Sequence, residues 1–150
     1  MDILYRKFIN SDIDELVKVY MNAFNNEPWN DEWTKKTAKE RLLDLINDKN
    51  SRILVGVNYY GTILGAIIGR KEVFYDGFHF QIIELFVDFN YKGLGIGTEL
   101  LRNMEYYLKQ EQIKRIYLLT LRTNDTIKFY EKNKFKEANN IVVMDKLNIY

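Results

Sequence analysis

Three glycines stand at alternate positions, Gly93, Gly95 and Gly97, in the stretch VDFNYKGLGIGTELL of residues 87–101. Glycine loses more conformational freedom on folding than other residues, so this cluster indicates that something approaches the backbone closely. A strand-like run precedes the cluster, and a helix-like run follows it. Such a turn exposes backbone N–H groups at the positive end of a helix, which suits a phosphate or diphosphate group.

The spacing of these glycines fits two familiar nucleotide-binding motifs poorly. A P-loop requires G-x-x-x-x-G-K-[ST], and a dinucleotide-binding turn requires G-x-G-x-x-G with an acidic residue about 20 positions later. This chain has G-x-G-x-G, and the region beyond it is Ile113-Lys114-Arg115. The alternative is a turn that binds no ligand, because loops alone can require glycine.

The elements that would position this turn alternate along the chain. Apolar residues at helical spacing predict helices over 13–24, 38–46, 100–108 and 127–130. β-rich runs predict strands over 3–8, 53–60, 62–73, 78–87, 113–120 and 141–144. Gly61 predicts a hairpin between the second and third strands, and Asp76-Gly77 predicts the next turn. No linker or repeat divides this pattern, so we expect a single domain over residues 1–150.

Composition excludes several classes of protein. With 22 basic and 21 acidic side chains in 150 residues, no strong field would draw the chain to nucleic acid or to an anionic membrane. The lack of cysteine excludes disulfides and thiolate metal clusters, and His79 alone cannot build a His-rich metal site. The start MDILYRKF resembles neither a signal peptide nor a membrane span, so we expect a cytoplasmic protein.

Two motifs together resemble those of the GCN5-related N-acetyltransferases (GNAT), which transfer acetyl from acetyl-CoA to an amine. The family motif R/Q-x-x-G-x-G/A falls on Lys92–Gly97, with lysine at its first position. The signature FYEKxGF is present as FYEKNKF at 129–135, with Lys134 in place of glycine. The resemblance implies an α/β (α+β) GNAT fold, with a mixed, mostly antiparallel, twisted sheet of about six to seven strands flanked by about four helices. It also implies one N-acetyltransferase domain that uses acetyl-CoA and no metal, and that pairs as a homodimer.

The resemblance assigns a set of positions to the cofactor. The diphosphate would lie against the N–H groups of the glycine turn, where a Cβ would block its approach. The pantetheine arm would pair with the preceding strand, which a bulge splays from its neighbour, and the N–H near Val87 would face the acetyl carbonyl. The expected cofactor residues are Leu85, Phe86, Val87, Lys92, Gly93, Leu94, Gly95, Ile96, Gly97, Thr98 and Asn124, the last lying one residue from the position where relatives often carry asparagine.

Catalysis by this mechanism needs a base and an acid. A primary amine with a pKa of about 10.4 is mostly protonated at pH 7, and freeing it costs roughly 4–5 kcal/mol unless the site takes up the proton. Gln81 occupies the position of the usual glutamate, so Glu84 is the candidate base, and the alternative is an exposed or helix-paired glutamate. Tyr130 stands at the family's general-acid position, and the alternative is a core tyrosine.

The connection between the first two predicted helices carries most of the expected acceptor site. Glu27, Trp29 and Trp33, with Tyr75 from a later loop, would give an aromatic and acidic lining for a cationic amine. The alternative is that the two tryptophans join the two helices while the acids are solvated. No motif identifies the acceptor, so a polyamine, an amino sugar, an amino acid and a peptide N-terminus all stay open.

The sequence therefore predicts an acetyl-CoA-dependent N-acetyltransferase that acts on a primary amine of a small molecule through a ternary complex. One alternative is a CoA-binding sensor or structural module without turnover, for which Gln81 is the best argument. Another is a peptide or protein N-acetyltransferase. We expect no nucleic-acid or membrane partner.

Overall fold

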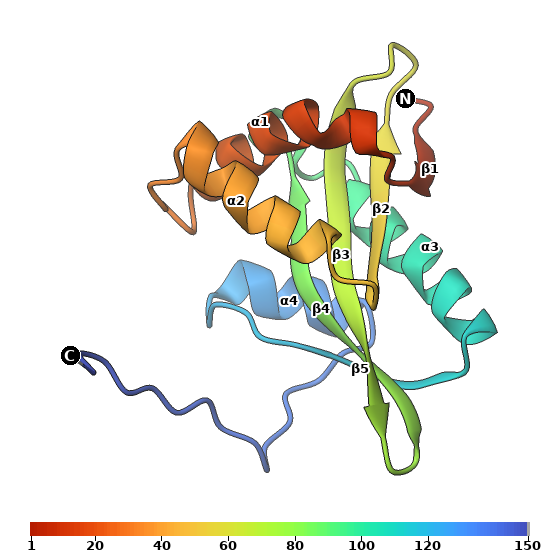
Figure 1. Ribbon diagram of the computed structural model, residues 1–150, viewed down its shortest axis with the longest axis vertical. Coiled ribbons are helices and arrows are strands. Elements are labelled where there is room, and N and C mark those ends of the chain that lie inside the picture. Colours follow the sequence, from red (N-terminus) through yellow and green to blue (C-terminus); the bar gives the residue numbers. More distant parts are fainter. Residues whose placement is uncertain (150) are drawn as a thin grey trace. The chain divides into compact units, whose positions relative to one another are not determined.

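The computed structural model describes residues 1–149, in an N-terminal unit, Met1–Leu119, and a C-terminal unit that begins at Thr120 (Figure 1). The elements of the N-terminal unit are β1 (Leu4–Lys7), the 3-10 helix η1 (Asn10–Asp12), α1 (Ile13–Phe24), α2 (Lys35–Ile46), β2 (Ser51–Val57), β3 (Ile63–Phe74), β4 (Gly77–Val87), the 3-10 helix η2 (Phe89–Tyr91), α3 (Ile96–Gln110) and β5 (Ile113–Leu118). The C-terminal unit contains α4 (Asn124–Lys132). None of the helices in the described residues is long and apolar enough to cross a membrane.

One five-stranded sheet with the order β1-β2-β3-β4-β5 forms the base of the N-terminal unit. Neighbouring strands are antiparallel except β4 and β5, which are parallel. The two predicted hairpins are present, one between β2 and β3 at Gly61 and one between β3 and β4 at Asp76-Gly77. The predicted fold class, α/β with a mixed and mostly antiparallel sheet and four α-helices in the chain, is confirmed over the described residues.

The predicted strand at 141–144 is wrong. These residues form no strand, so the described sheet has five strands instead of the expected six to seven. The four side chains are 52% to 87% exposed, and they are Ile141, Val142, Val143 and Met144. A β-rich composition favours a strand only where a neighbouring strand takes up its backbone hydrogen bonds, and the run of apolar residues does not specify that neighbour.

Helices cover both faces of the sheet. Successive strand residues point to opposite faces, and in β4 the ring of Phe86 packs 5.2 Å from that of Tyr20 and 5.6 Å from that of Phe24. The α1–α2 face therefore receives Glu84 and Phe86, while Leu85 and Val87 are turned to the face that α3 covers. The buried core on the α1–α2 face includes Leu16, Val17, Ala38, Leu42, Val55, Ala66 and Ile68.

Polar side chains define where the first two helices begin. Thr34 caps α2, and its hydroxyl accepts a hydrogen bond from the N–H of Thr37 at 3.1 Å. The carboxylate of Asp12 accepts hydrogen bonds from both terminal nitrogens of Arg6, at 2.8 and 3.0 Å, and from the N–H of Ile9 at 2.9 Å. This buried aspartate therefore ties β1 to the start of α1.

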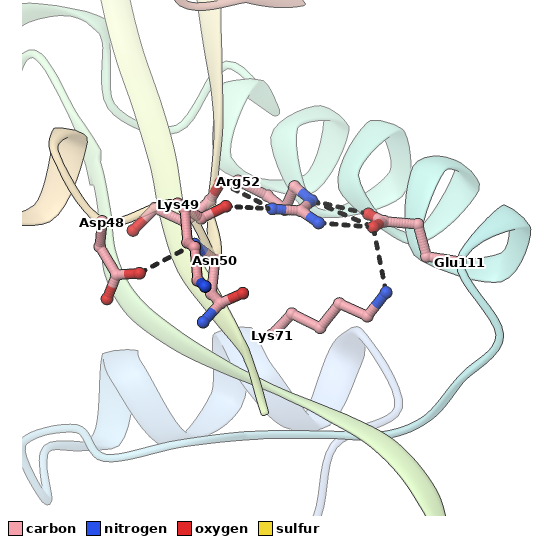
Figure 2. Close-up of polar contacts among 7 residues, drawn as sticks. Asp48, Lys49, Asn50, Arg52, Lys71 and Glu111 are labelled. Atoms are coloured by element: carbon pink, nitrogen blue, oxygen red, sulfur yellow. Dashed lines mark hydrogen bonds and ion pairs between the residues drawn. The ribbon is translucent and has the colours of Figure 1, made fainter. Parts of the chain in front are cut away.

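A second ion cluster joins β2, β3 and the end of α3 (Figure 2). The guanidinium of Arg52 donates to both carboxylate oxygens of Glu111, at 2.7 and 2.9 Å, and Lys71 lies 3.5 Å from the same carboxylate. Arg52 also donates to the carbonyl oxygens of Lys49 and Ser51. Five of the hydrogen bonds in this cluster therefore come from one guanidinium, which ties the start of β2 to the end of α3.

The C-terminal unit begins its helix with a cap and ends it with a backbone turn. The hydroxyl of Thr123 accepts a hydrogen bond from the N–H of Thr126 at 3.2 Å. At the other end, Lys134 has a φ of 70°, its N–H donates to the carbonyl of Glu131, and the N–H of Phe135 donates to the carbonyl of Tyr130. This is the Schellman arrangement, in which glycine is the usual residue at the position of Lys134.

Candidate active site

The glycine turn places α3 directly after two left-handed residues. Gly93 has a φ of 78° and Gly95, which is the N-cap of α3, has a φ of 81°. A Cβ at either position would have no neighbour within 4 Å, so the backbone angle is what requires glycine in this structure. No described residue accepts a hydrogen bond from the N–H groups of Ile96, Gly97 and Thr98, which leaves the first turn of α3 open to an anion.

Among residues 1–149, no strand pairs with the outer edge of β4 next to this turn. β5 pairs with β4 from Phe78 to Ile82, and a register shift opposite Ile68 and Gly69 leaves Ile83 as an extra residue in β4. Beyond this bulge, β4 continues to Val87 with β3 as its only partner strand in the described chain. The predicted separation of this strand from its neighbour is therefore present at residues 83–87.

The backbone N–H groups of this edge point outward. The N–H of Asp88 donates to the carbonyl of Leu64, the residue before Gly65 in β3, at 2.7 Å. Because N–H groups alternate in direction along a strand, those of Leu85 and Val87 point away from β3. They are therefore available to a chain or carbonyl group that lies along the edge.

Glu84 is buried and forms an ion pair with α2. Its Oε1 accepts hydrogen bonds from Nη2 of Arg41 at 2.9 Å and from Nε of Arg41 at 3.3 Å. Burial raises the pKa of Glu84, and the guanidinium of Arg41 opposes that rise. Burial also raises the pKa of Tyr20, and the Glu84 carboxylate beside it adds to the rise. The structure thus shows the helix-paired glutamate of the sequence analysis, on the face of the sheet that α1 and α2 cover.

The two tryptophans of the expected acceptor site pack against the core. The ring of Trp33 lies 5.2 Å from that of Tyr20, and the ring of Trp29 lies 5.4 Å from that of Phe24. The side chain of Asn25 holds the same connection by accepting from the N–H of Trp33 and donating to its carbonyl oxygen. Both tryptophans therefore join the α1–α2 connection to the core, which is the structural alternative of the sequence analysis.

Lys92 and Glu27 meet across two connections. The ammonium of Lys92 donates to the backbone carbonyl of Glu27 at 2.9 Å and lies 5.2 Å from the centre of the Phe89 ring. Nearby, the N–H of Phe89 donates to Oδ1 of Asn22 at 2.7 Å. The α1–α2 connection is thus bonded to the segment that carries the glycine turn, and the carboxylate of Glu27 stays exposed.

Tyr75 lies apart from the other expected acceptor residues. Its side chain is 95% exposed at the tip of the β3–β4 hairpin. Gly77, which begins β4 two residues after Tyr75, is about 25 Å from Leu85, because strand residues advance about 3.3 Å each. The structure does not bring Tyr75 together with Trp29 or Glu84.

Tyr130 and Asn124 belong to the C-terminal unit. The half-buried ring of Tyr130 packs 5.0 Å from that of Phe129 and 5.6 Å from that of Phe135. Asn124 is the first residue of α4, and Thr123 provides the cap. The roles of both residues stay predictions.

A hollow of about 460 Å³ lies elsewhere in the N-terminal unit. Its wall includes Lys7, Arg52, Tyr107 and Glu111, and none of the predicted site residues. The hollow is lined by the start of β2, where Ser51 pairs with Arg70 of β3. Val87 pairs with Gly65, five residues earlier in β3, so the hollow lies toward the other end of β3 from the proposed thioester edge. In the described residues no cluster of histidine and acidic side chains could hold a metal ion.

Sequence reasoning missed Arg41 as the partner of Glu84, although a signal was present. Arg41 stands between Ala38, Leu42 and Leu45 at helical spacing, so it lies on the buried stripe of α2. Glu84 likewise stands at an inward position of β4, among positions that apolar residues usually occupy. Two opposite charges on inward faces of neighbouring elements indicate an ion pair, because an unpaired buried charge is costly.

The chain resembles known proteins over most of its length. Residues 13–135 match the family model described as "Acetyltransferase (GNAT) family". The chain is 26% identical over 142 residues to an acetyltransferase of Sodalis glossinidius, covering 94% of this chain and 92% of that protein.

Two solved structures share the fold. A GNAT family acetyltransferase of Staphylococcus aureus superposes with a TM-score of 0.75 and 21% identity, over 98% of this chain and 100% of that one. An aminoglycoside acetyltransferase from an uncultured soil metagenomic sample, solved with trehalose, superposes with a TM-score of 0.73 and 16% identity, over 99% and 97% of the two chains.

Proposed function

The chain belongs to the GNAT acetyltransferase family, and on that basis we propose that it transfers an acetyl group from acetyl-CoA directly to a primary amine of a small molecule. One observation carries the proposal. The N–H groups of Leu85 and Val87 point outward from a strand edge that leads into the open first turn of α3. A thioester arm can pair with such a strand edge, and a diphosphate can bind at such a helix N-terminus.

The residues present fit acetyl-CoA. The open N–H groups of Ile96, Gly97 and Thr98 would bind the diphosphate, and the left-handed turn at Gly93 and Gly95 leaves the space above them clear. Lys92 would add its charge after leaving the carbonyl of Glu27. The outward edge of β4 at Leu85 would hold the pantetheine arm in the manner of an added strand.

The chemistry of this chain would come from three groups. The N–H of Val87 would donate a hydrogen bond to the acetyl oxygen as negative charge develops there. Glu84 would accept the proton that the amine loses when its nitrogen bonds to the acetyl carbon, directly or through water, and burial raises the pKa of this carboxylate above its ordinary value. The hydroxyl of Tyr130 would supply a proton to the sulfur as the C–S bond breaks.

The test is acetyl-CoA turnover with a panel of amines. Free thiol would be measured with a colorimetric reagent, and each acetylated amine would be identified by mass. The panel would include polyamines, amino sugars, amino acids and short peptides with free N-termini. We expect thiol release that depends on a small amine, with one acetyl added per thiol. Acetylation of the peptides alone would overturn the small-molecule assignment, and tight binding of acetyl-CoA without thiol release would overturn turnover of these amines.

A further inference from the structure

We propose that the acceptor carries a carboxylate beside its amine, as an amino acid does, and that Arg41 binds this carboxylate. The inference rests on the proposed function, because it concerns the acceptor of the same site. It starts from the ion pair between Arg41 and Glu84. The aromatic and acidic residues of the expected acceptor site predict binding of a cation, whereas Arg41 adds a positive charge that can bind an anion.

Arg41 has binding capacity left after it pairs with Glu84. A guanidinium has five N–H donors in one plane, and Glu84 takes two of them through a single oxygen, Oε1. Tyr20 lies beside the guanidinium and can take one more. The side chain of Arg41 is 36% exposed while that of Glu84 is 10% exposed, so Arg41 is the more accessible member of the pair.

The position of Arg41 faces the route that an acceptor would take. Glu84 directly precedes Leu85, the first residue of the proposed thioester edge, and points to the α1–α2 face. The proposed diphosphate site lies at the start of α3, which covers the other face. An amine that meets the thioester from the side opposite the cofactor therefore passes the guanidinium of Arg41.

Asp31 supplies the opposite charge on the same side. Its carboxylate accepts a hydrogen bond from Nε1 of Trp33 at 3.0 Å, and the Trp33 ring packs 5.2 Å from that of Tyr20, which lies beside Arg41 and Glu84. The side chain of Asp31 is exposed, in the α1–α2 connection. A cation at Arg41 and an anion at Asp31 complement a zwitterion, with carboxylate on the first and ammonium on the second.

Purely cationic acceptors fit this arrangement less well. A polyamine or an aminoglycoside would bring only positive charge to Arg41, and like charges oppose binding. The N-terminal amine of a peptide has an amide where an amino acid has its carboxylate, so it offers no anion to the donors of Arg41 that Glu84 does not take up. The carboxylate is therefore the feature by which the site would select its acceptor.

The experiment measures binding without turnover. The protein would be saturated with CoA, which has no acetyl group to transfer, and titrated in a calorimeter with an amino acid, its carboxamide and the decarboxylated amine of the same side chain. We expect the carboxylate form to bind about 10- to 100-fold more tightly than the other two, as a charge-assisted hydrogen bond predicts. The Arg41→Gln variant would lose this preference, and Arg41→Lys would keep part of it.

A second variant keeps the test independent of folding. Arg41→Gln leaves Glu84 buried without its partner, so the Arg41→Gln/Glu84→Gln double variant, which removes both charges, would be titrated with the same three ligands. Equal or tighter binding of the carboxamide by the unaltered protein, or a preference that survives in the double variant, would overturn the inference. A carboxylate preference in a protein that releases no thiol with any amine would refute the proposed turnover alone.

Discussion

Arg41 of α2 donates two hydrogen bonds to the same carboxylate oxygen of Glu84 of β4, from Nη2 at 2.9 Å and from Nε at 3.3 Å. The pair joins α2 to β4 at the residue directly before Leu85, which lies in the unpaired edge. Glu84 is therefore both a structural partner and a carboxylate close in sequence to the proposed reaction. The predictions below separate these two roles and test other parts of the fold.

Glu84→Gln is expected to lower kcat/KM by about 100-fold, with the larger loss on the low-pH side of the profile, because the amine proton then has no acceptor. The measurement is the pH profile of thiol release. Glu111→Gln is the matched control, since Glu111 is also paired with an arginine but lies at the far end of α3. A Glu84→Gln profile with the same shape as that of the unaltered protein would remove Glu84 from the role of base.

Asp12 is expected to support stability above its ordinary pKa. Hydrogen bonds from Arg6 lower the pKa of Asp12 in the folded chain, so its contribution is present above about pH 4 and is lost as the pH falls through the lowered value. Asp12→Asn should cost about 1–3 kcal/mol of unfolding free energy at pH 7. Urea unfolding at several pH values measures this cost. A cost that grows toward low pH would contradict the predicted loss of the Asp12 contribution in acid.

Lys134→Gly is expected to stabilise the end of α4. Lys134 has a φ of 70°, and a left-handed backbone costs an L-residue about 1–2 kcal/mol, which the greater chain entropy of glycine offsets in part. The amide of Phe135, which donates to the carbonyl of Tyr130, should therefore exchange with solvent about three- to fivefold more slowly. Lys132→Gly, inside α4, is the control and should speed exchange. Faster exchange in Lys134→Gly would argue against strain at this residue.

Tyr130→Phe is expected to lower kcat by about 10- to 100-fold with little change in the affinity for CoA, because it removes a proton donor and keeps the ring. The ring contacts with Phe129 and Phe135 are apolar and should survive the change. Steady-state kinetics and CoA titration report the two quantities separately. An unchanged kcat would leave Tyr130 as a packing residue of the C-terminal unit.

Local signals in the sequence predicted most elements of the fold. The turn at Gly61 and the apolar stripe of α3 each depend on residues a few positions apart, and the structure has both of them. The strand predicted at 141–144 depends on a distant partner strand, and composition carries no information about that partner.

The candidate site was predictable where it depends on backbone geometry. The alternation that turns Glu84 away from Leu85, and the turn of Gly93 and Gly95, follow from strand periodicity and from glycine's conformational freedom. The pairing of Glu84 with Arg41 joins residues far apart in sequence. The inward positions of the two charges indicate a buried pair, and the packing of α2 on the sheet shows that these two residues meet. The same holds for the contact of Trp33 with Tyr20.

The most direct test of the account is the response of individual backbone amides to acetyl-CoA, measured by NMR on the isotope-labelled protein. The account predicts that the amides of Leu85 and Val87, together with those of residues 93–98, shift and exchange more slowly when acetyl-CoA binds. Shifts confined to the hollow around Arg52 and Tyr107, with Leu85 and Val87 unchanged, would contradict it.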